Sequence, residues 1–552
     1  MKKIIFSLGI TCLFLSSCSK TTLQGIQENK GLEKQSFTWN GANIYFLLTD
    51  RFNNGDKTND VNYSRTKKTA KLRGFEGGDF RGIINKIQDN YFSDLGINAI
   101  WMNPIVEQIH GDVNEGQGTT YGFHGYWTKD WTAIDKNWGT ENELQELISK
   151  AHAKGIRIML DAVINHTGPV TDVDTVFPSD WVRLSPQCTY QSYKTTIECT
   201  LVENLPDILT ESENDVMLPP QLIEKWKKEG RLEKEVEELN LFFAKYNLPK
   251  APKYYIMKWL SDYIRKYGID GYRVDTVKHT EEEVWKKFAE ICQDAFTEYK
   301  TNNPTKVLDN NKFFLIGEVY NYTINDAQEF PFPDKKVNYY NNGFDALINF
   351  DLRSTQKETF QQVFNRYNNV LQNEMGGKTV MNYITSHDDG SPFDKTRENA
   401  WDAGTRLLLT PGISQVYYGD ESARPLEIEG AEGDANLRSF MNWDGIKSDK
   451  DKKALLLHFQ KLGQFRRNHP AVGAGKQKDL QNEPYIFYRN YNNDEVIIAL
   501  GYSNEQKKIK VADFWKEGTK VKDFYSGTVS TVKDGFVVLN TNFDTVLLEK
   551  IK

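Results

Sequence analysis

The sequence predicts an α/β protein built on a (β/α)8 TIM barrel, with an inserted domain after strand 3 and a C-terminal antiparallel β-sandwich. Three features of the pattern predict this architecture. Apolar, β-rich runs recur with amphipathic stretches between them, their spacing breaks once after the third run, and the helical pattern stops near Asn468.

Eight runs are rich in apolar and β-branched residues, as parallel strands covered on both faces should be. They lie at 44–52, 98–105, 157–166, 271–276, 313–320, 344–351, 380–388 and 413–421. Amphipathic stretches that we expect to be helices separate most of them, for example 80–95, 141–154, 254–267 and 281–299. Eight alternations of strand and helix are typical of a closed barrel.

About a hundred residues separate the third run from the fourth, far more than one βα connection needs. We therefore place an inserted domain at 167–253, inside a barrel domain at 37–466. Its later part, 222–246, is highly charged and predicts one or two solvent-facing helices. Short alternating segments follow after the barrel and predict a β-sandwich at 467–552.

The composition is that of a globular protein, and its 552 residues are too many for one compact core. The formal net charge is −7 with no long run of one sign, so we expect no nucleic-acid partner. Aromatic residues make up 13% of the chain, which suits stacking on the C–H faces of sugars. A large aromatic core would explain this composition as well.

The N-terminus resembles an export signal. Lys2 and Lys3 precede an apolar run at 4–15 that is too short to span a bilayer. Residues 15–18, Leu-Ser-Ser-Cys, resemble the lipobox of bacterial lipoproteins, so we expect a signal peptide at 1–17, a lipid on Cys18 and a flexible tether at 18–36. This predicts an exported outer-membrane lipoprotein that faces the periplasm or the cell surface. A plain secretory signal is the alternative.

The remaining cysteines are interpreted through export. Cys188 and Cys199 lie close together in a polar stretch, and an oxidising compartment would favour a disulfide between them. Cys292 lies in a helical pattern and is expected to be a buried thiol.

Acidic residues lie at the ends of four predicted strands. The third run ends in DAVINH (161–166), the fourth in Arg273-Val274-Asp275, the fifth in Gly317-Glu318, and the seventh in SHDD (386–389). Barrel active sites form where the carboxyl ends of the strands meet. Carboxylates buried at one mouth cost free energy unless they have a role, so this cluster predicts a catalytic site.

Two carboxyl groups suffice for glycoside cleavage, one as proton donor and one as nucleophile. Arg273 lies two residues before Asp275, so both side chains point to the same side of the strand. Its guanidinium would keep that carboxylate ionised. We therefore predict Asp275 as nucleophile, Glu318 as proton donor, and Asp388 as a third carboxylate that grips substrate hydroxyls.

At these residues the chain resembles the α-amylase superfamily of glycoside hydrolases. DAVINH, GYRVDTVKH (271–279), GEVY (317–320) and SHDD match its four motifs in order, and YGFHGYW (121–127) and LPDI (205–208) also fit. GFDALINFDL (343–352), YGDESARP (418–425) and QFRRNHPAVGAGKQ (464–477) resemble the periplasmic α-amylases of Gram-negative bacteria most closely. The resemblance implies sugar contacts from His166 and His387, stacking by Tyr126, and a leaving-group side lined by Lys278 and His279.

The resemblance also implies calcium (Ca2+). Asn165, Asp207 and the backbone carbonyl of His279 match the site that ties the inserted domain to the barrel in that family. A second set resembles a calcium loop of the cyclodextrin-forming enzymes and comprises Asn54, Asp56, Asn59, Asp60, Gly77 and Asp79. The alternative for the second set is an ordinary turn rich in Asn and Asp.

Three functions remain open at this point. The first is endo-hydrolysis of α-1,4-glucosidic bonds in starch, glycogen and maltooligosaccharides. The second is glucan transfer or cyclodextrin hydrolysis with the same carboxyl groups, since water and sugar compete for one covalent intermediate. The third is a non-catalytic glucan-binding protein, which would usually have lost one of the acids. We expect the chain to act as a monomer on an α-glucan.

Overall fold

The computed structural model describes residues 37–114 and 116–551, which belong to one compact unit. The predicted signal peptide at 1–17 and tether at 18–36 lie outside the described residues. Within the described part, no helix is both long and apolar enough to cross a membrane.

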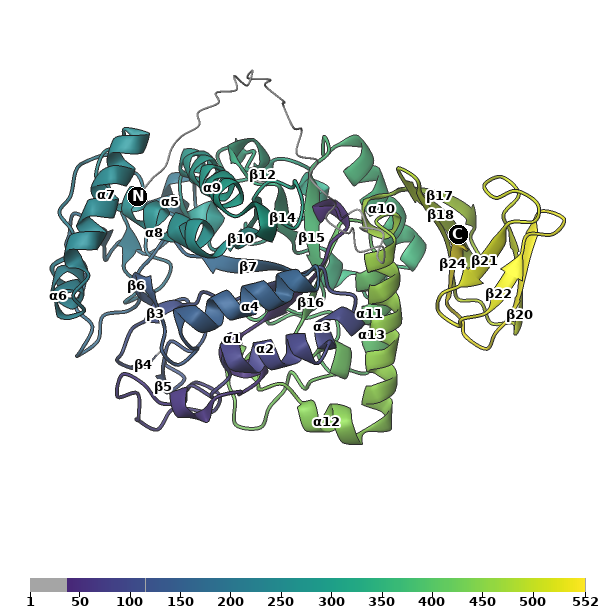
Figure 1. Cartoon of the computed structure of the whole chain (residues 1–552), viewed down its shortest axis with the longest axis horizontal. Coiled ribbons are helices and arrows are strands. Elements are labelled where there is room, and N and C mark those ends of the chain that lie inside the picture. Colours follow the sequence, from purple (N-terminus) through teal and green to yellow (C-terminus); the bar gives the residue numbers. More distant parts are fainter. Residues whose placement is uncertain (1–36, 115, 552) are drawn as a thin grey trace, which may run out of the picture. The chain divides into compact units, whose positions relative to one another are not determined.

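Eight parallel strands close into the predicted barrel (Figure 1), in the order β1-β16-β15-β14-β11-β10-β7-β2. Each overlaps one of the eight expected runs. The strands are β1 Asn43–Leu47, β2 Ala99–Met102, β7 Arg157–Ala162, β10 Gly271–Val274, β11 Phe314–Gly317, β14 Ala346–Asn349, β15 Thr379–Tyr383 and β16 Ile413–Tyr417. Every residue of these strands is buried, because side chains fill the barrel and helices cover it.

The strand register brings the acidic strand ends together. Arg273 in β10 lies beside Asp161 in β7, and Val274 lies beside Gly317 in β11. Asp275 and Glu318 each follow directly after these strands. Pairing of neighbouring strands therefore places three of the motifs at one edge of the barrel.

Helices surround the barrel (Figure 1), and the longer ones fall where amphipathic stretches predict them. They are α2 Phe80–Gln88, α3 Tyr91–Asp94, α4 Glu141–Ala153, α8 Pro252–Tyr267, α9 Glu282–Asn302, α10 Phe360–Asn373, α11 Ala400–Leu409 and α13 Lys450–Asn468. The expected helix at 80–95 is two helices, because Asn90 between them adopts a left-handed conformation with φ 66°. Asn tolerates that conformation better than most residues, and it ends the first helix.

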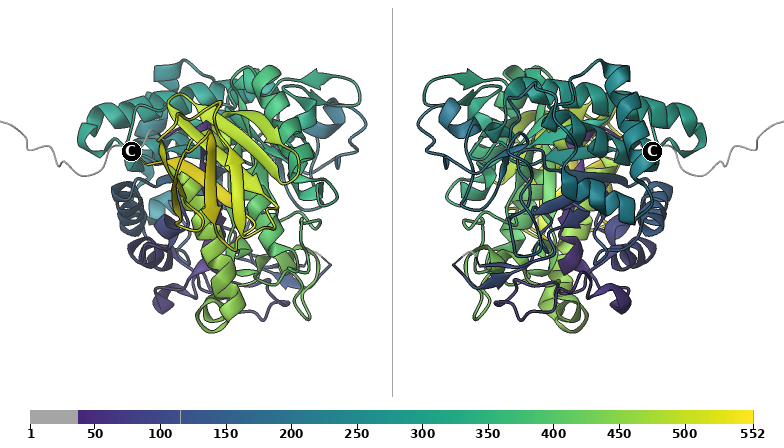
Figure 2. Two further views of the ribbon diagram at one scale, coloured as in Figure 1. Left: turned by 90° about the vertical axis from the view of Figure 1, so that its right-hand side faces the viewer. Right: turned by 90° about the vertical axis from the view of Figure 1, so that its left-hand side faces the viewer.

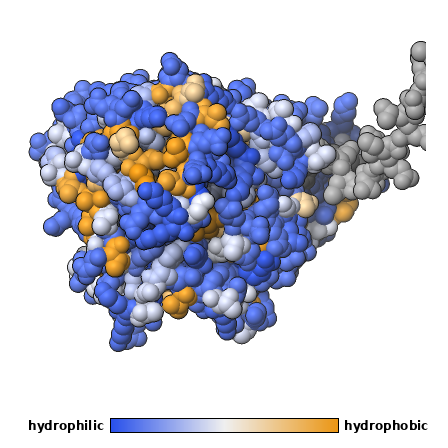
Figure 3. Space-filling model, turned by 60° about the vertical axis from the view of Figure 1, so that its left-hand side comes forward, coloured by the Kyte–Doolittle hydropathy of each residue, from blue (hydrophilic) through white to orange (hydrophobic). Residues whose placement is uncertain are grey.

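The inserted segment contains two short strands, β8 Val182–Arg183 and β9 Asp207–Ile208, and three helices, α5 Lys194–Ile197, α6 Pro220–Lys228 and α7 Leu232–Tyr246. The charged stretch at 222–246 is thus two helices, separated at Gly230, which has a positive φ of 70°. Figure 3 brings forward the side of the molecule that carries α6 and α7, and it shows a mostly hydrophilic surface with separate apolar patches.

Shorter elements complete the barrel region. They are helices α1 Thr49–Phe52, α12 Trp443–Ser448 and α14 Ala471–Ala474 and strands β3 Val106–Gln108, β4 Val113–Asn114, β5 Thr119–Thr120, β6 Thr128–Ile134, β12 Phe330–Pro331 and β13 Lys336–Val337.

The C-terminal region is the predicted antiparallel sandwich, seen as yellow strands in Figure 2. A six-stranded sheet has the order β17-β18-β19-β24-β21-β22, and β20 pairs with β23. The strands are β17 Lys476–Gln481, β18 Tyr485–Tyr491, β19 Asp494–Leu500, β20 Gln506–Lys510, β21 Lys520–Asp523, β22 Val529–Thr531, β23 Phe536–Asn540 and β24 Val546–Lys550. The sequence pattern did not predict β17 as a separate strand, because this edge strand is polar and buries none of its residues.

Arg489, a buried arginine of this sheet, contacts the barrel, and Arg466 of the barrel contacts the same end of α11. Arg489 in β18 donates to the carbonyls of Leu409 (2.6 Å) and Val472 (2.5 Å). Arg466 in α13 donates to the carbonyl of Leu408 at 3.0 Å. Two of these carbonyls end α11, where the helix dipole carries partial negative charge, so the arginines satisfy groups that would otherwise be orphaned.

His469, just after α13, makes a pH-dependent contact with the same sheet. Its two ring nitrogens contact Asp494 Oδ1 at 2.7 Å and Glu549 Oε2 at 2.9 Å. Burial alone would lower the pKa of His469, but these carboxylates outweigh burial and raise it to about 9.

We expect His469→Gln to lower the free energy of unfolding by about 2 kcal/mol at pH 6. The folded-state pKa is raised, so this stabilisation is complete below pH 6.5 and is lost as the pH rises through about 9. Urea unfolding of both proteins at pH 6 and at pH 9.5 measures this. A difference that does not shrink with pH would contradict the ion-pair interpretation.

Candidate active site

The predicted catalytic residues lie together at the carboxyl ends of the barrel strands. Asp275 follows β10, Glu318 follows β11, His166 lies shortly after β7, and His387 and Asp388 follow β15. Of these five, all but Asp388 are less than a tenth exposed. The structure thus brings side chains from four separate sequence motifs to one mouth.

Arg273 is the centre of the cluster and is 1% exposed. One terminal nitrogen donates to Asp275 Oδ1 at 2.7 Å and to Asp161 Oδ1 at 2.9 Å. The other lies 3.0 Å from Glu318 Oε1. A single guanidinium therefore contacts three carboxyl groups and offsets their mutual repulsion.

Glu318 is the carboxyl group best suited to hold a proton. Burial, together with the nearby charges of Asp275 and Asp388, raises its pKa to about 8 against the opposing effect of Arg273. The backbone N–H of Thr276 donates to Glu318 Oε2 at 2.9 Å. Thr276 has a φ of 48°, an uncommon conformation for a β-branched residue, and this strained residue lies directly after Asp275.

Asp388 has the opposite character. Burial raises its pKa, but His387, the Ser386 hydroxyl and Arg273 outweigh burial, so the net shift is downward. Ser386 donates to Asp388 Oδ1 at 2.6 Å. Arg438 donates to the backbone carbonyl of His387 at 2.9 Å and so fixes the loop. At a pH at which Glu318 is still protonated, Asp388 is therefore ionised.

The predicted sugar contacts form one wall of the site. The rings of Tyr126 and His387 stack with centroids 5.2 Å apart. Burial lowers the pKa of His387 to about 4, so it is neutral near pH 7. The Nε2 of His166 lies 3.1 Å from the carbonyl of Tyr126, and because a carbonyl can only accept, this nitrogen carries the proton.

Asp161 belongs to the carboxyl cluster but was not among the predicted site residues. It accepts hydrogen bonds from the Tyr126 hydroxyl at 2.9 Å and the Trp101 indole at 3.3 Å, besides Arg273. Burial raises its pKa to about 7. The available signal was position, because Asp161 opens the DAVINH motif and pairs in register with Arg273.

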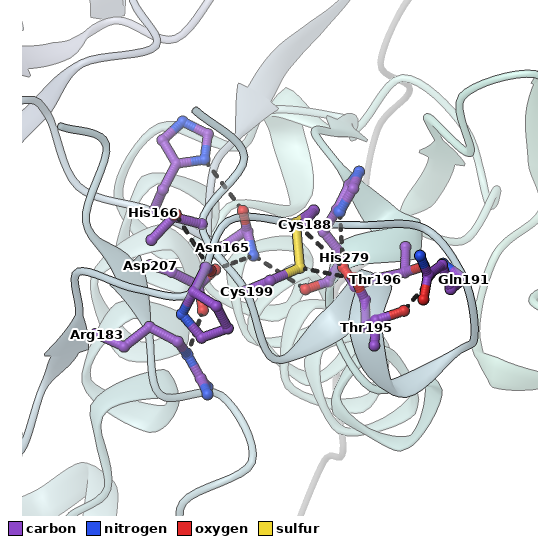
Figure 4. The surroundings of a disulfide bond; sticks show 12 residues. Asn165, His166, Arg183, Cys188, Gln191, Thr195, Thr196, Cys199, Asp207 and His279 are labelled. Carbon is purple, nitrogen blue, oxygen red and sulfur yellow. Dashed lines mark hydrogen bonds and ion pairs between the residues drawn. A yellow bond between two sulfur atoms is a disulfide. The ribbon is translucent and has the colours of Figure 1, made fainter. Parts of the chain in front are cut away.

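Lys278 and His279 lie in the turn that follows β10 and Asp275. The ammonium of Lys278 donates to the carbonyl of Tyr320 at 3.2 Å. His279 Nδ1 contacts the carbonyl of Thr196 in α5 at 2.8 Å, so its ring faces the inserted segment (Figure 4). Burial lowers the pKa of His279 to about 4.

The expected disulfide between Cys188 and Cys199 is present and closes the loop that carries α5 (Figure 4). The sulfur of Cys199 lies 3.3 Å from the carbonyl of Thr195. Cys292 is a buried free thiol, as predicted.

The first predicted calcium set is assembled in one place (Figure 4). The amide nitrogen of Asn165 lies 2.8 Å from Asp207 Oδ1 and 3.0 Å from the carbonyl of His279. Arg183 donates to the other oxygen of Asp207 at 2.7 Å. Burial raises the pKa of Asp207 to about 8 despite this arginine.

The second predicted calcium set also converges, around the loop after α1. Asn54 donates to Asp60 Oδ1 at 2.8 Å, and a Cβ added to Gly77 would lie within 2.7 Å of both side chains. Among the described residues, Asn54 Oδ1 and Asn59 Oδ1 are buried amide oxygens without a hydrogen-bond partner.

The other members of this set have structural contacts of their own. Asp79 caps α2 through Gly82 N at 2.6 Å, and Asp56 accepts from Thr58 N at 2.9 Å. In the described part of the chain, no three His, Cys, Asp or Glu side chains form a metal-binding group. A cation at either site would therefore need amide or backbone oxygens beside the carboxylates.

A separate cavity of about 840 Å³ lies away from the carboxyl cluster. Its lining comes mainly from β6, α7 and α8, and no predicted site residue contributes to it. We therefore locate the candidate active site by the converging carboxyl groups and not by the volume of this cavity.

Comparison with known proteins decides the family. The family model described as alpha amylase, catalytic domain, matches residues 46–475, which include every site residue described above. The chain belongs to the alpha-amylase family. The alpha-amylase match starts within β1 and extends past α14, so it covers seven of the eight barrel strands in full and the inserted segment.

Relatives within this family carry more than one name. The chain is 34% identical over 522 residues to the periplasmic alpha-amylase of Escherichia coli (strain K12), a match that spans 84% of this chain and 72% of that protein. It is 28% identical over 484 residues to a cyclomaltodextrin glucanotransferase of Niallia circulans, spanning 85% of this chain and 59% of that protein.

Solved structures agree in fold. An alpha-amylase from Geobacillus thermoleovorans, solved with acarbose, matches with a TM-score of 0.65 and 21% identity. The match covers 94% of this chain and 100% of that one. An Anoxybacillus alpha-amylase matches with a TM-score of 0.64 and 23% identity over 94% of this chain and all of that one. At these identities the likeness shows the fold alone.

Proposed function

We propose that this protein is a retaining α-amylase that hydrolyses internal α-1,4-glucosidic bonds in starch, glycogen and maltooligosaccharides. The observation that carries the proposal is the contact of one buried guanidinium, Arg273, with both Asp275 and Glu318. The name of the Escherichia coli relative supports the same activity.

The two carboxyl groups divide the chemistry. Glu318 holds a proton because burial and nearby carboxylates raise its pKa, and it gives that proton to the leaving glycosidic oxygen. Asp275 attacks the anomeric carbon and forms a covalent glycosyl-enzyme. Glu318, now ionised, takes a proton from the water that releases the sugar. Retaining enzymes hold the two carboxyl groups about 5 Å apart, whereas inverting enzymes leave a wider gap that admits water. Contact of both carboxyl groups with one guanidinium favours the closer, retaining arrangement.

Other side chains would hold the sugar next to the acids. Neutral His387 can donate a hydrogen bond to a hydroxyl, and His166 would share its Nε2 proton between the Tyr126 carbonyl and the sugar. Tyr126 offers a ring that is fixed through Asp161. Asp388 would accept from two hydroxyls and favour a distorted ring. Lys278 and His279 would line the leaving-group side, beside Tyr320.

Product analysis over time with soluble starch and maltoheptaose tests the function, with Glu318→Gln as control. We expect an early spread of shorter maltooligosaccharides that the control does not produce. Products longer than maltoheptaose, or cyclic ones, would instead favour the glucanotransferase or cyclodextrin-hydrolysing alternative, whose names also occur among the relatives. If no products form at all, the protein would be interpreted as a non-catalytic glucan-binding protein.

We propose that calcium binds at Asn165, Asp207 and the carbonyl of His279. His166 carries its proton on Nε2, so its Nδ1 is a bare acceptor, yet it faces Asn165 Oδ1 at 3.3 Å. Exchanging the oxygen and nitrogen of that amide gives His166 a donor and leaves three oxygens facing one another. A calcium ion would satisfy these oxygens and stabilise the ionised form of Asp207.

We propose a second calcium at Asn54, Asp56, Asn59, Asp60, Gly77 and Asp79. Two buried amide oxygens without partners, together with the Asp60 carboxylate, form an oxygen-rich donor set of the kind that this cation prefers. When bound, calcium at this second site would supply charge that holds the loop after α1 in place.

Titration calorimetry of the chelator-treated protein should then show two calcium ions per chain, and one in each of Asp207→Asn and Asp60→Asn. At a free concentration of 100 times Kd, each ion should add about 2.7 kcal/mol to the free energy of unfolding. Unfolding by urea with and without chelator measures this term. Unchanged unfolding in chelator, with no calorimetric binding, would refute both sites.

The location and organisation of the chain are part of the same proposal. We propose an exported lipoprotein of the outer membrane, anchored through Cys18, as the periplasmic name of the Escherichia coli relative supports in its coarse form. We further propose the domain limits 37–466, 167–253 and 467–552, and a monomer. Mass spectrometry of the mature N-terminus, with detection of a lipid on Cys18, tests the anchor.

A further inference from the structure

Four aromatic rings form a continuous row outside the catalytic mouth. The ring of Trp401 lies 4.4 Å from that of His458, which lies 5.7 Å from Tyr525, which in turn lies 5.1 Å from Phe543. Both ends of the row face solvent, because Trp401 is 48% exposed and Phe543 is 44% exposed. Single exposed apolar side chains are common on folded surfaces, but these two are joined through two further rings into one row.

Hydrogen bonds fix the centre of this row. His458 Nε2 lies 3.2 Å from the carbonyl of Trp401, so Nε2 carries the proton. Its Nδ1 is then the acceptor for the Tyr525 hydroxyl at 2.6 Å. His458 is 3% exposed and joins α11, α13 and the segment after β21. The two exposed rings are therefore held by a rigid support before any ligand binds.

Trp401, one end of the row, lies at the end of the barrel where substrate would arrive. Trp401 is in the first turn of α11, and the chain reaches this helix directly from Asp388 through residues 389–399. In a (β/α)8 barrel, a helix begins at the face where the preceding strand ends, which is the face of the active site. A long polymer held at Trp401 can therefore continue toward the carboxyl cluster.

The chemistry of the row suits a neutral sugar chain. Its two exposed rings, Trp401 and Phe543, do not contact each other directly, because His458 and Tyr525 lie between them. The ammonium of Lys461 lies 4.7 Å from the ring centres of both Tyr525 and Phe543, where it can donate to hydroxyls. A membrane or a protein partner would require a larger continuous apolar surface. Sugars offer apolar C–H faces bordered by hydroxyls, which match rings bordered by polar groups.

We propose that Trp401 and Phe543 form a second, non-catalytic binding site for α-glucan chains, which holds polymeric substrate near the mouth. This inference rests on the proposed function, since the same polymer would occupy both sites. It predicts a difference between long and short substrates that the carboxyl cluster alone does not produce.

The test uses Trp401→Ala/Phe543→Ala in the full chain. Affinity electrophoresis with amylose, in a Glu318→Gln background that prevents cleavage, should show at least fivefold weaker retention than the Glu318→Gln parent. In the otherwise wild-type background, KM for soluble starch should rise severalfold while kcat stays within twofold. Hydrolysis of maltoheptaose should be unchanged. Met217→Ala, which removes an 81% exposed side chain from the inserted segment, is the matched control and should change none of these.

Two results would overturn the inference. One is amylose retention equal to that of the Glu318→Gln parent. The other is an equal loss on starch and maltoheptaose, which would mean that the substitutions disturb the catalytic site or the fold. Failure of the proposed function has a different signature, because the wild-type chain itself would then release no products from either substrate.

Discussion

Asp275→Asn should reduce kcat/KM on maltoheptaose by on the order of 10⁴-fold while leaving the fold intact. The amide oxygen can still accept the 2.7 Å hydrogen bond from Arg273, so the packing around the guanidinium is retained. The amide cannot attack the anomeric carbon, because it has no negative charge to share with the developing oxocarbenium ion. Steady-state kinetics, with thermal melting of the same samples, measures both effects.

The matched control for this prediction is Asp389→Asn, which replaces the neighbouring acid of the SHDD motif. Asp389 accepts from the Tyr383 hydroxyl at 2.6 Å and pairs with Arg353, away from Arg273. Its substitution should cost far less activity than that of Asp275. Cleavage by Asp275→Asn within tenfold of wild type would refute its role as nucleophile.

Glu318→Gln should lower kcat/KM on maltoheptaose by about 10² to 10⁴-fold and remove the alkaline limb of the pH profile. The acid must be protonated to act, and burial raises its pKa to about 8, so wild-type activity should fall as the pH rises through that value. The variant has no proton to lose there, and its residual rate should not show this limb.

A substrate that needs no proton separates the two chemical steps. With a maltosyl fluoride, Glu318→Gln should form the glycosyl-enzyme, because fluoride leaves without assistance. Release is slow, because the amide that replaces the carboxylate cannot activate water. An adduct on the peptide that contains Asp275 should therefore accumulate and be detectable by mass spectrometry. An adduct elsewhere, or an unchanged alkaline limb, would contradict the assignment of Glu318.

The same substitution should change stability in a pH-dependent way. The folded-state pKa of Glu318 lies above its ordinary value of 4.5, so the folded protein loses stability as the pH rises from about 4.5 to 8. The amide of the variant does not titrate. As the pH rises from 5 to 8.5, the free energy of unfolding of Glu318→Gln should therefore increase by about 1 to 3 kcal/mol relative to that of wild type. Urea unfolding of both proteins measures this difference.

The barrel could be predicted from the sequence because each of its strands is marked by a short apolar run. Each run is apolar almost throughout, since helices and core cover both faces, and the eight observed strands overlap the eight runs. Elements with mixed patterns were harder. The polar edge strand β17 did not stand out, and Asn90 divides a stretch that looked like one helix.

For the site, the sequence indicated which side chains reach the mouth, but not their partners. Strand ends and motif spacing gave Asp275, Glu318 and Asp388, because side-chain alternation along a strand follows from the backbone alone. The contact between Asp161 and Arg273 required the register of two neighbouring strands. The raised pKa of Glu318 required burial, which depends on the whole mouth being closed around it.

By itself, the sequence determined the class of fold, the order of the chemical groups and the disulfide partners, since these depend on residue type and spacing along the chain. Only the tertiary structure decided which oxygens face one another at Asn165, and which rings adjoin across distant segments, as Trp401, His458 and Phe543 do. The physical reason is that such contacts join segments far apart in the chain, whose relative positions are fixed only when strands, helices and sandwich pack together.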